Sequence, residues 1–91
     1  KLTAVAGKRD ALIAILAEGT GDMPGCQSYV IATDPADPDA IWITEVWDSR
    51  DHHHASLQLP SVRAAITRGR PLIAGMGPHT ETVPVAGHGL R

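Results

Sequence analysis

Apolar residues recur three and four positions apart early in the chain, which is the spacing of one buried helix face. The stripe consists of Leu12, Ile15 and Leu16, flanked by Ala11 and Ala14. This pattern predicts a helix over residues 8–18. We expect Gly19 and Gly21 to end it, because glycine readily adopts the left-handed conformation past a helix end.

Two segments further along favour strands because they are rich in β-branched and aromatic residues, and they cover residues 26–33 and residues 40–47. Residues 34–39, between them, hold two prolines and three aspartates and are expected to form a loop. Two strands joined by a short loop make a hairpin. Another strand is expected at residues 2–6, closed by Gly7.

Two short helices are predicted next, over residues 50–58 and residues 60–69. A side-chain oxygen of Ser49 or Asp48 can cap the first helix. Pro60 suits the first turn of the second helix, where its missing N–H leaves no hydrogen bond unmade. The buried stripe of the second helix is expected to be Val62, Ala65 and Ile66.

The C-terminal part of the chain is expected to contain one more strand. Gly75 and Gly77 indicate a loop, and residues 79–83 favour the strand itself. Pro84 places that strand at a sheet edge or ends it, because proline cannot donate to a strand ladder. Residues 87–91 are expected to be a tail.

The order of elements is strand, helix, strand, strand, helix, strand. This order predicts one α+β domain over residues 1–91, with a ferredoxin-like four-stranded antiparallel sheet and helices on one face. Along residues 40–47, side chains alternate between the two faces of the strand. One face carries Ile41, Ile43, Glu45 and Trp47, and the other carries Trp42, Thr44 and Val46. Both faces hold large apolar groups, so the face without helices is expected to pack on a second copy of the chain.

Composition and charge narrow the classes of partner. The net charge is −2, and the 8 lysines and arginines do not run together, so we expect no nucleic-acid partner. No apolar run reaches the roughly 18 residues that span a membrane. The single cysteine, Cys26, cannot form an intramolecular disulfide and fits a reducing compartment. With no signal peptide visible, a cytoplasmic location is expected, although the sequence begins at Lys1 without Met.

Candidate chemistry concentrates between Glu45 and Leu57, where a carboxylate, a tryptophan and three consecutive histidines occur together. Neighbouring residues on a helix point about 100° apart, so His52, His53 and His54 cannot all face one metal ion, and no metal site is expected. His53 is four residues before Leu57, on or beside the buried face, where it could accept a proton from a substrate. The alternative is a purely structural histidine in the first helical turn.

Three other side chains are candidates for binding a substrate, each with a structural alternative. Glu45 could line a cavity, or it could form a salt bridge with Arg63, Arg68 or a residue of a partner subunit. Trp47 could stack on a flat ligand or belong to the core or an interface. Tyr29 could donate a hydrogen bond to a ligand oxygen or lie at a dimer surface. His79 and His88 would join a metal site only if folding happened to bring them there.

An ordered set of short segments resembles the antibiotic biosynthesis monooxygenase family of the dimeric α+β barrel superfamily. The matching residues are Gly7-Lys8-Arg9-Asp10, Pro24-Gly25-Cys26, Tyr29, the Asp-Pro loop at 34–38, Glu45-Val46-Trp47-Asp48-Ser49 and Pro60. Many members place a histidine nine residues after the tryptophan, where this chain has Ser56. It resembles instead a branch with the histidine six residues after the tryptophan, which selects His53. The absence of asparagine argues against the haem-degrading branch, which uses an Asn, Trp and His set.

The resemblance implies a homodimer with a pocket between sheet and helices. It also implies an oxygenase that needs neither flavin, haem nor metal, because an electron-rich quinol-like or polyketide aromatic can itself donate an electron to oxygen. His53 would then be the base, with Trp47, Tyr29 and Glu45 around the substrate. Two alternatives stay open: a non-enzymatic ligand-binding or stress protein, and an isomerase or lyase acting on small lactones or polyketide rings.

Overall fold

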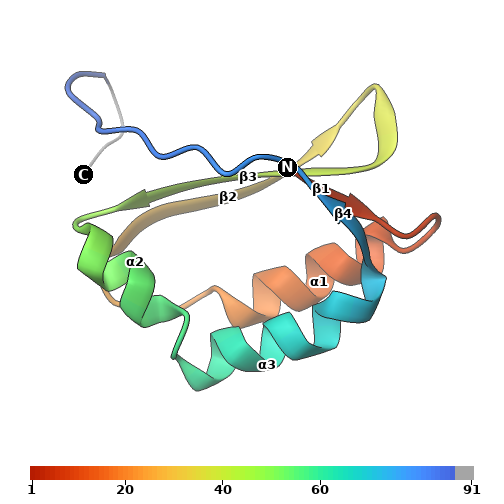
Figure 1. Cartoon of the computed structure of the whole chain (residues 1–91), viewed down its shortest axis with the longest axis horizontal. Coiled ribbons are helices and arrows are strands. Elements are labelled where there is room, and N and C mark those ends of the chain that lie inside the picture. Colours follow the sequence, from red (N-terminus) through yellow and green to blue (C-terminus); the bar gives the residue numbers. More distant parts are fainter. Residues whose placement is uncertain (88–91) are drawn as a thin grey trace.

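Residues 1–87, the part of the chain that the computed structural model describes, fold into a four-stranded antiparallel sheet with helices on one side (Figure 1). The elements in chain order are β1 Leu2–Ala4, α1 Arg9–Gly19, β2 Cys26–Asp34, β3 Asp37–Trp47, α2 Arg50–Ser56, α3 Pro60–Gly69, a 3-10 turn Arg70–Leu72 and β4 Ile73–Met76. The strands lie in the order β2-β3-β1-β4. Helices α1 and α3 pack side by side below the sheet (Figure 1). The predicted α+β ferredoxin-like fold is confirmed.

The β2–β3 hairpin is tighter than expected, and the predicted loop over residues 34–39 is wrong. Only Pro35 and Ala36 form the turn, because Asp34 already pairs with Asp37 across the ladder. A carboxylate oxygen of Asp34 accepts a hydrogen bond from the Ala36 amide at 2.8 Å. This side-chain bond imitates a backbone turn, which is why an aspartate before proline supports a hairpin here as well as a loop.

Pro38 lies inside β3 although proline cannot donate to a ladder. The register shifts there, because Thr33 pairs with Ile41 whereas the next residue of β2 pairs with Asp37. The residues of β3 between these two pairs form a bulge with no residue of β2 opposite them. Because no residue of β2 lies opposite Pro38, the N–H that proline lacks is not needed for the β2–β3 ladder.

The last strand within residues 1–87 is Ile73–Met76, so the prediction of a strand at residues 79–83 is wrong. Strand β4 pairs with β1, with Leu2 opposite Met76, and a final hydrogen bond joins the Gly77 amide to the Lys1 carbonyl at 2.8 Å. A strand is defined by its partner as much as by its own residues. Strand β1 offers its free edge to the chain emerging from the 3-10 turn, and Ile73–Met76 take that edge first.

The core lies between the sheet and α1. Its buried members are Leu2, Ala4, Leu12 and Ile41, and the partly buried side chains packed on them are Ile13, Leu16, Ile31, Ile43, Leu72 and Ile73. Each large aliphatic side chain removed from water contributes about 1.5–3 kcal/mol. The predicted helix stripe is thus confirmed at Leu12, and Val62 and Ala65 are buried as expected on α3. Ile66 is 39% exposed, so its assignment to the core is wrong.

Gly19 has a different role from the one expected. Neither Gly19 nor Gly21 has a positive φ, so neither ends α1 through the left-handed conformation. Gly19 is the buried last residue of α1, and a Cβ there would overlap the Cβ of Ala65 and lie 3.0 Å from the carbonyl oxygen of Ser61. The missing side chain therefore allows α1 and α3 to approach closely.

The side of the sheet away from α1 and α3 exposes large apolar groups, as the alternation along β3 predicts. Ile41 is fully buried, whereas its neighbour Trp42 is 46% exposed and Val30 on β2 is 51% exposed. The Trp42 indole donates a hydrogen bond to Asp34 at 3.0 Å, and the Lys1 ammonium lies 5.3 Å from the ring centroid. The first contact satisfies the indole N–H, and the second places a positive charge near the ring. Nearly half of the tryptophan nevertheless stays exposed to water.

Candidate functional site

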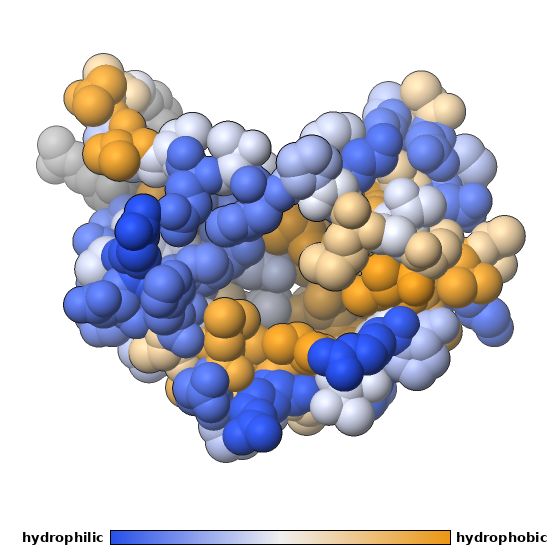
Figure 2. Space-filling view, viewed as in Figure 1, coloured by the Kyte–Doolittle hydropathy of each residue, from blue (hydrophilic) through white to orange (hydrophobic). Residues whose placement is uncertain are grey.

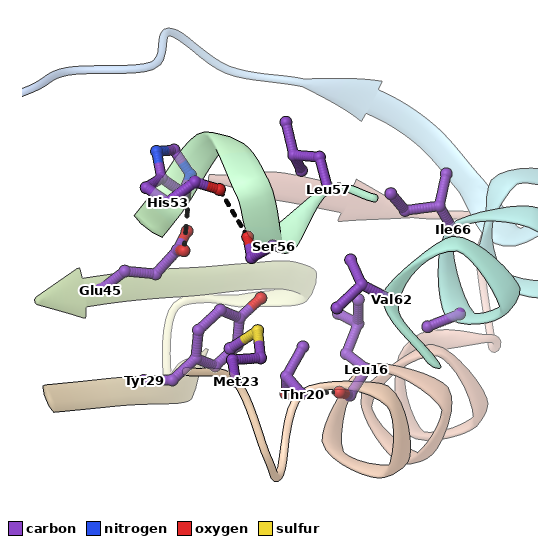
Figure 3. Close-up of a pocket in the computed structure, with 11 residues that line it drawn as sticks. Leu16, Thr20, Met23, Tyr29, Glu45, His53, Ser56, Leu57, Val62 and Ile66 are labelled. Carbon is purple, nitrogen blue, oxygen red and sulfur yellow. Dashed lines mark hydrogen bonds and ion pairs between the residues drawn. The ribbon is translucent and has the colours of Figure 1, made fainter. Parts of the chain in front are cut away.

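A cavity of about 130 Å³ opens between β2, β3 and the three helices. The space-filling view shows a hollow in this face of the molecule with apolar side chains on its rim (Figure 2). The lining residues are Leu16, Thr20, Met23, Tyr29, Glu45, His53, Ser56, Leu57, Val62, Ala65 and Ile66. Six of the eleven are apolar, and the polar ones come from β2, β3, α2 and the residue that follows α1 (Figure 3). Such a combination is typical of a small-molecule site.

Helix α2 positions His53 through hydrogen bonds at both of its ends. The Ser49 hydroxyl accepts a hydrogen bond from the His52 amide at 3.1 Å, which confirms the predicted cap. The buried Ser56 hydroxyl donates to the His53 carbonyl at 2.6 Å. The backbone of His53 is thereby held one turn inside the helix, with the ring toward the cavity (Figure 3).

His53 lies beside a carboxylate and an indole. Its Nε2 is 3.8 Å from Oε1 of Glu45, and its side chain is 22% exposed. The Trp47 ring is 5.3 Å from the His53 ring, centroid to centroid, and its Nε1 donates to the same Glu45 oxygen at 3.0 Å. The Trp47 hydrogen bond fixes the Glu45 carboxylate beside the His53 ring.

Tyr29 pairs with Glu45 across the β2–β3 ladder and presents its ring to the cavity (Figure 3). Burial raises the pKa of the Tyr29 hydroxyl to about 12, and the negative charges of Glu45 and Cys26 add to the shift. The phenol therefore stays protonated at neutral pH. It can donate a hydrogen bond to an anionic ligand oxygen but does not act as a base.

Three of the four predicted site residues share the cavity, namely His53, Tyr29 and Glu45. Trp47 is not among the lining residues; it contacts His53 and Glu45 from outside the cavity. The suggested pairing of Glu45 with Arg68 is not made, because Arg68 pairs with Glu18 at 3.3 Å.

The apolar wall of the cavity was not predicted as part of the site. Met23, which is 8% exposed, and Thr20 come from the connection after α1, where the glycine-rich sequence indicated only a turn. Leu57 and Ile66 belong to segments assigned to helices, and only their partial exposure distinguishes them from core residues. One feature of the sequence could have indicated this wall: Ile66 lies at the margin of the apolar stripe of α3. A residue at the margin of such a stripe faces the gap between two helices.

The three histidines of α2 point to different surroundings. The His52 ring contacts Asp48, one turn earlier, and packs over Gly25, whose φ of +82° and lack of a side chain leave room for it. His53 and His54 have ring centroids 5.9 Å apart, and both have a ligating nitrogen within 4.8 Å of a carboxylate oxygen of Glu81. These three side chains are the ones that could hold a metal ion within residues 1–87. His88 lies outside the described residues.

The model of the antibiotic biosynthesis monooxygenase family matches residues 1–68, three quarters of the chain. The chain belongs to this family. A crystal structure from Chloroflexus aurantiacus J-10-fl, described as a candidate antibiotic biosynthesis monooxygenase, is 67% identical with a TM-score of 0.94, covering 98% of this chain and 91% of the other. One from Deinococcus radiodurans with the same description is 28% identical with a TM-score of 0.71, covering 94% and 93%. No curated protein matches the chain.

The family match ends near the C-terminus of α3, so β4 and the segment after it lie beyond it. All the residues that line the cavity fall inside the matched range. The cavity is therefore built from the part of the chain that defines the antibiotic biosynthesis monooxygenase family. None of the helices within residues 1–87 has the length and apolar character needed to cross a membrane.

Proposed function

We propose that this protein is a cofactor-independent monooxygenase that oxidises a small, single-ring quinol. The observation that carries the proposal is the arrangement of His53, Tyr29 and Glu45 around one apolar cavity in an antibiotic biosynthesis monooxygenase fold. A base, a neutral hydrogen-bond donor and a carboxylate are the groups needed to bind a phenol and remove its proton. Fold alone does not fix the reaction, so the assignment depends on these side chains.

The size of the cavity restricts the substrate. An engineered apolar cavity of about 150 Å³ in another protein binds benzene. The cavity here measures about 130 Å³ and opens at one side, so it fits one aromatic ring whose substituents reach the mouth. A fused polyketide would not fit without displacement of the wall. Between the two classes of aromatic expected from the sequence, the single-ring quinol is therefore the better candidate.

The reaction follows from the placement of the polar groups. His53 accepts the phenolic proton, and the Tyr29 hydroxyl donates a hydrogen bond to a quinol oxygen. The electron-rich anion transfers an electron to dioxygen, and recombination forms a carbon–oxygen bond at the ring. Loss of water from the resulting peroxide gives a hydroxyquinone. One quinol and one dioxygen thus yield one hydroxyquinone and one water, with all four electrons supplied by the quinol.

Oxygen consumption with a panel of hydroquinones tests the proposal. We expect uptake of one dioxygen per quinone formed, with one labelled oxygen atom in the product when isotopically labelled dioxygen is supplied. His53→Ala should lower kcat/KM by about 100-fold or more, the contribution of a general base. His52→Ala is the matched control, because that ring contacts Asp48 and lies outside the cavity.

Other outcomes of the same experiment identify the alternatives. A quinol that raises the melting temperature without oxygen uptake would indicate a binding protein. Conversion of a ligand without oxygen uptake would indicate an isomerase or lyase. Uptake that is equally fast in His53→Ala would contradict the role given to this histidine.

We further propose that two copies associate through the side of the sheet that carries Trp42 and Val30. The exposure of these two side chains supports this, because a monomer gains nothing from keeping a tryptophan half in water. The short chain supports it as well, since a domain of about this size buries only about 60–65% of its unfolded surface and benefits from association.

A further inference from the structure

Two segments far apart in the sequence meet at α2, the helix that carries His53. The chain beyond β4 runs back along the molecule toward α2 (Figure 1). There the Arg50 guanidinium pairs with the Glu81 carboxylate at 2.8 Å, and the His79 ring lies 6.1 Å from the His53 ring. This segment thus brings a carboxylate and an imidazole to the helix that already presents His53 and His54.

The atoms that meet there have the character of metal ligands. One nitrogen each of His53 and His54 and one carboxylate oxygen of Glu81 all lie within 4.8 Å of one another. A tetrahedral ion with bonds of about 2.0–2.2 Å would draw these atoms together by rotation of three side chains. His54 and Glu81 are exposed and can turn far, whereas His53 is half-buried and needs to turn less.

Two consecutive histidines can share an ion here because the third ligand does not come from the helix. Residues 53 and 54 point about 100° apart, so an ion between them would lie off the helix surface. The segment containing Glu81 passes over that position and completes the set. His52, on the far side of the helix, contacts Asp48 instead and does not take part.

We propose that His53, His54 and Glu81 form a site for a divalent cation of borderline softness, with Zn²⁺ as the representative ion. Two imidazoles and one carboxylate suit Zn²⁺ and Co²⁺, whereas Mg²⁺ and Ca²⁺ prefer all-oxygen sets. The existing Arg50–Glu81 ion pair opposes binding only weakly, because both side chains are largely exposed and such pairs are worth about 0–1 kcal/mol.

A cation at this site would occupy the group proposed as the base. An imidazole whose lone pair binds a metal ion no longer accepts a proton, so Zn²⁺ is expected to inhibit the oxidation of quinols. The inhibition rests on the proposed function, whereas the binding does not. The two can therefore be tested separately.

Calorimetric titration of the chelator-treated full chain with Zn²⁺ tests the binding. We expect one ion per chain, with the affinity lowered about tenfold or more in His54→Ala and in Glu81→Gln. Co²⁺ bound at the same site should give the visible absorption of a tetrahedral complex. His52→Ala should bind as the unchanged protein does. Binding that is unaffected by both His54→Ala and Glu81→Gln, or no binding at all, would overturn the proposal.

Oxygen uptake tests the consequence. Zn²⁺ should inhibit the unchanged protein and should inhibit His54→Ala only at about tenfold higher concentration or more. Neither His54 nor Glu81 lines the cavity, so both variants should retain the metal-free activity. If the protein binds Zn²⁺ as described but oxidises no quinol, the proposal of the metal site stands and the proposed function is refuted. Equal inhibition of both proteins would show that Zn²⁺ acts elsewhere.

Discussion

At the scale of single residues, Tyr29 offers the most direct measurement, because it is the only tyrosine in the chain. Burial raises the pKa of its hydroxyl from 10.0 to about 12. Titration followed by the ultraviolet absorbance of tyrosinate should therefore show no ionisation through pH 10. A midpoint at the ordinary value in the folded protein would contradict the burial of the phenol.

The same shift predicts how stability depends on pH. The unfolded chain releases the Tyr29 proton near pH 10, whereas the folded chain holds it to about pH 12. Its contribution is thus fully present below pH 10 and is lost as the pH rises through about 12. Tyr29→Phe removes this component, so its stability should fall less than that of the unchanged protein over this interval, as measured by chemical denaturation.

How far the site could be predicted differs from residue to residue. Helix and strand periods are local properties of the sequence and place His53 and Glu45 on definite faces, and the resemblance to the family selects His53 by its offset from Trp47. Trp47 is on the same face of β3 as Glu45, but it is the last residue of the strand and does not line the cavity. The approach of Glu81 to His54 depends on the path of an irregular segment, and no period in the sequence encodes that path.

At the scale of elements, the helices were predictable and the sheet edges were not. The start of α2 follows from the cap at Ser49 and the start of α3 from Pro60, and both signals act within one turn. Strand β4 depends instead on pairing with β1, about seventy residues earlier in the chain. Residues 79–83 have the better strand composition, but pairing overrode propensity because the free edge of β1 is reached first.

The contact between α1 and α3 gives a prediction of its own. Gly19→Ala should destabilise the protein by about 1–3 kcal/mol, because the new methyl overlaps Ala65 and lies 3.0 Å from the Ser61 carbonyl. The usual advantage of alanine in a helix, up to about 1 kcal/mol, opposes this only in part. Chemical denaturation measures the difference in the free energy of unfolding.

Two further variants separate packing from backbone effects. Gly75→Ala adds a methyl in β4 where nothing lies within 4 Å, so its stability should change by no more than about 0.5 kcal/mol. Combining Gly19→Ala with Ala65→Gly removes the overlapping methyl on α3 and should recover part of the loss. If Gly19→Ala alone is as stable as the unchanged protein, the helices do not approach at this glycine.

At the scale of the whole molecule, the two sides of the sheet differ in what covers them. The cavity lies on the side covered by helices, and residues of α1, α2 and α3 line it. Trp42 and Val30 point to the other side, because side chains alternate along β2 and β3. A partner bound there would cover the exposed apolar groups without closing the cavity. Association and substrate binding should therefore be separable by substitution.

Trp42→Lys tests this separation. A charge in place of a tryptophan at the centre of the proposed interface should weaken association by about 30-fold or more, equivalent to about 2 kcal/mol. Sedimentation over a range of concentrations should then show a dimer for the unchanged protein and a monomer for the variant. Ala14→Lys, which adds the same charge on the exposed side of α1, should remain dimeric. An unchanged protein that sediments as a monomer throughout would contradict the interface, whereas a monomeric Trp42→Lys variant that still binds quinols would establish that each cavity is complete within one chain.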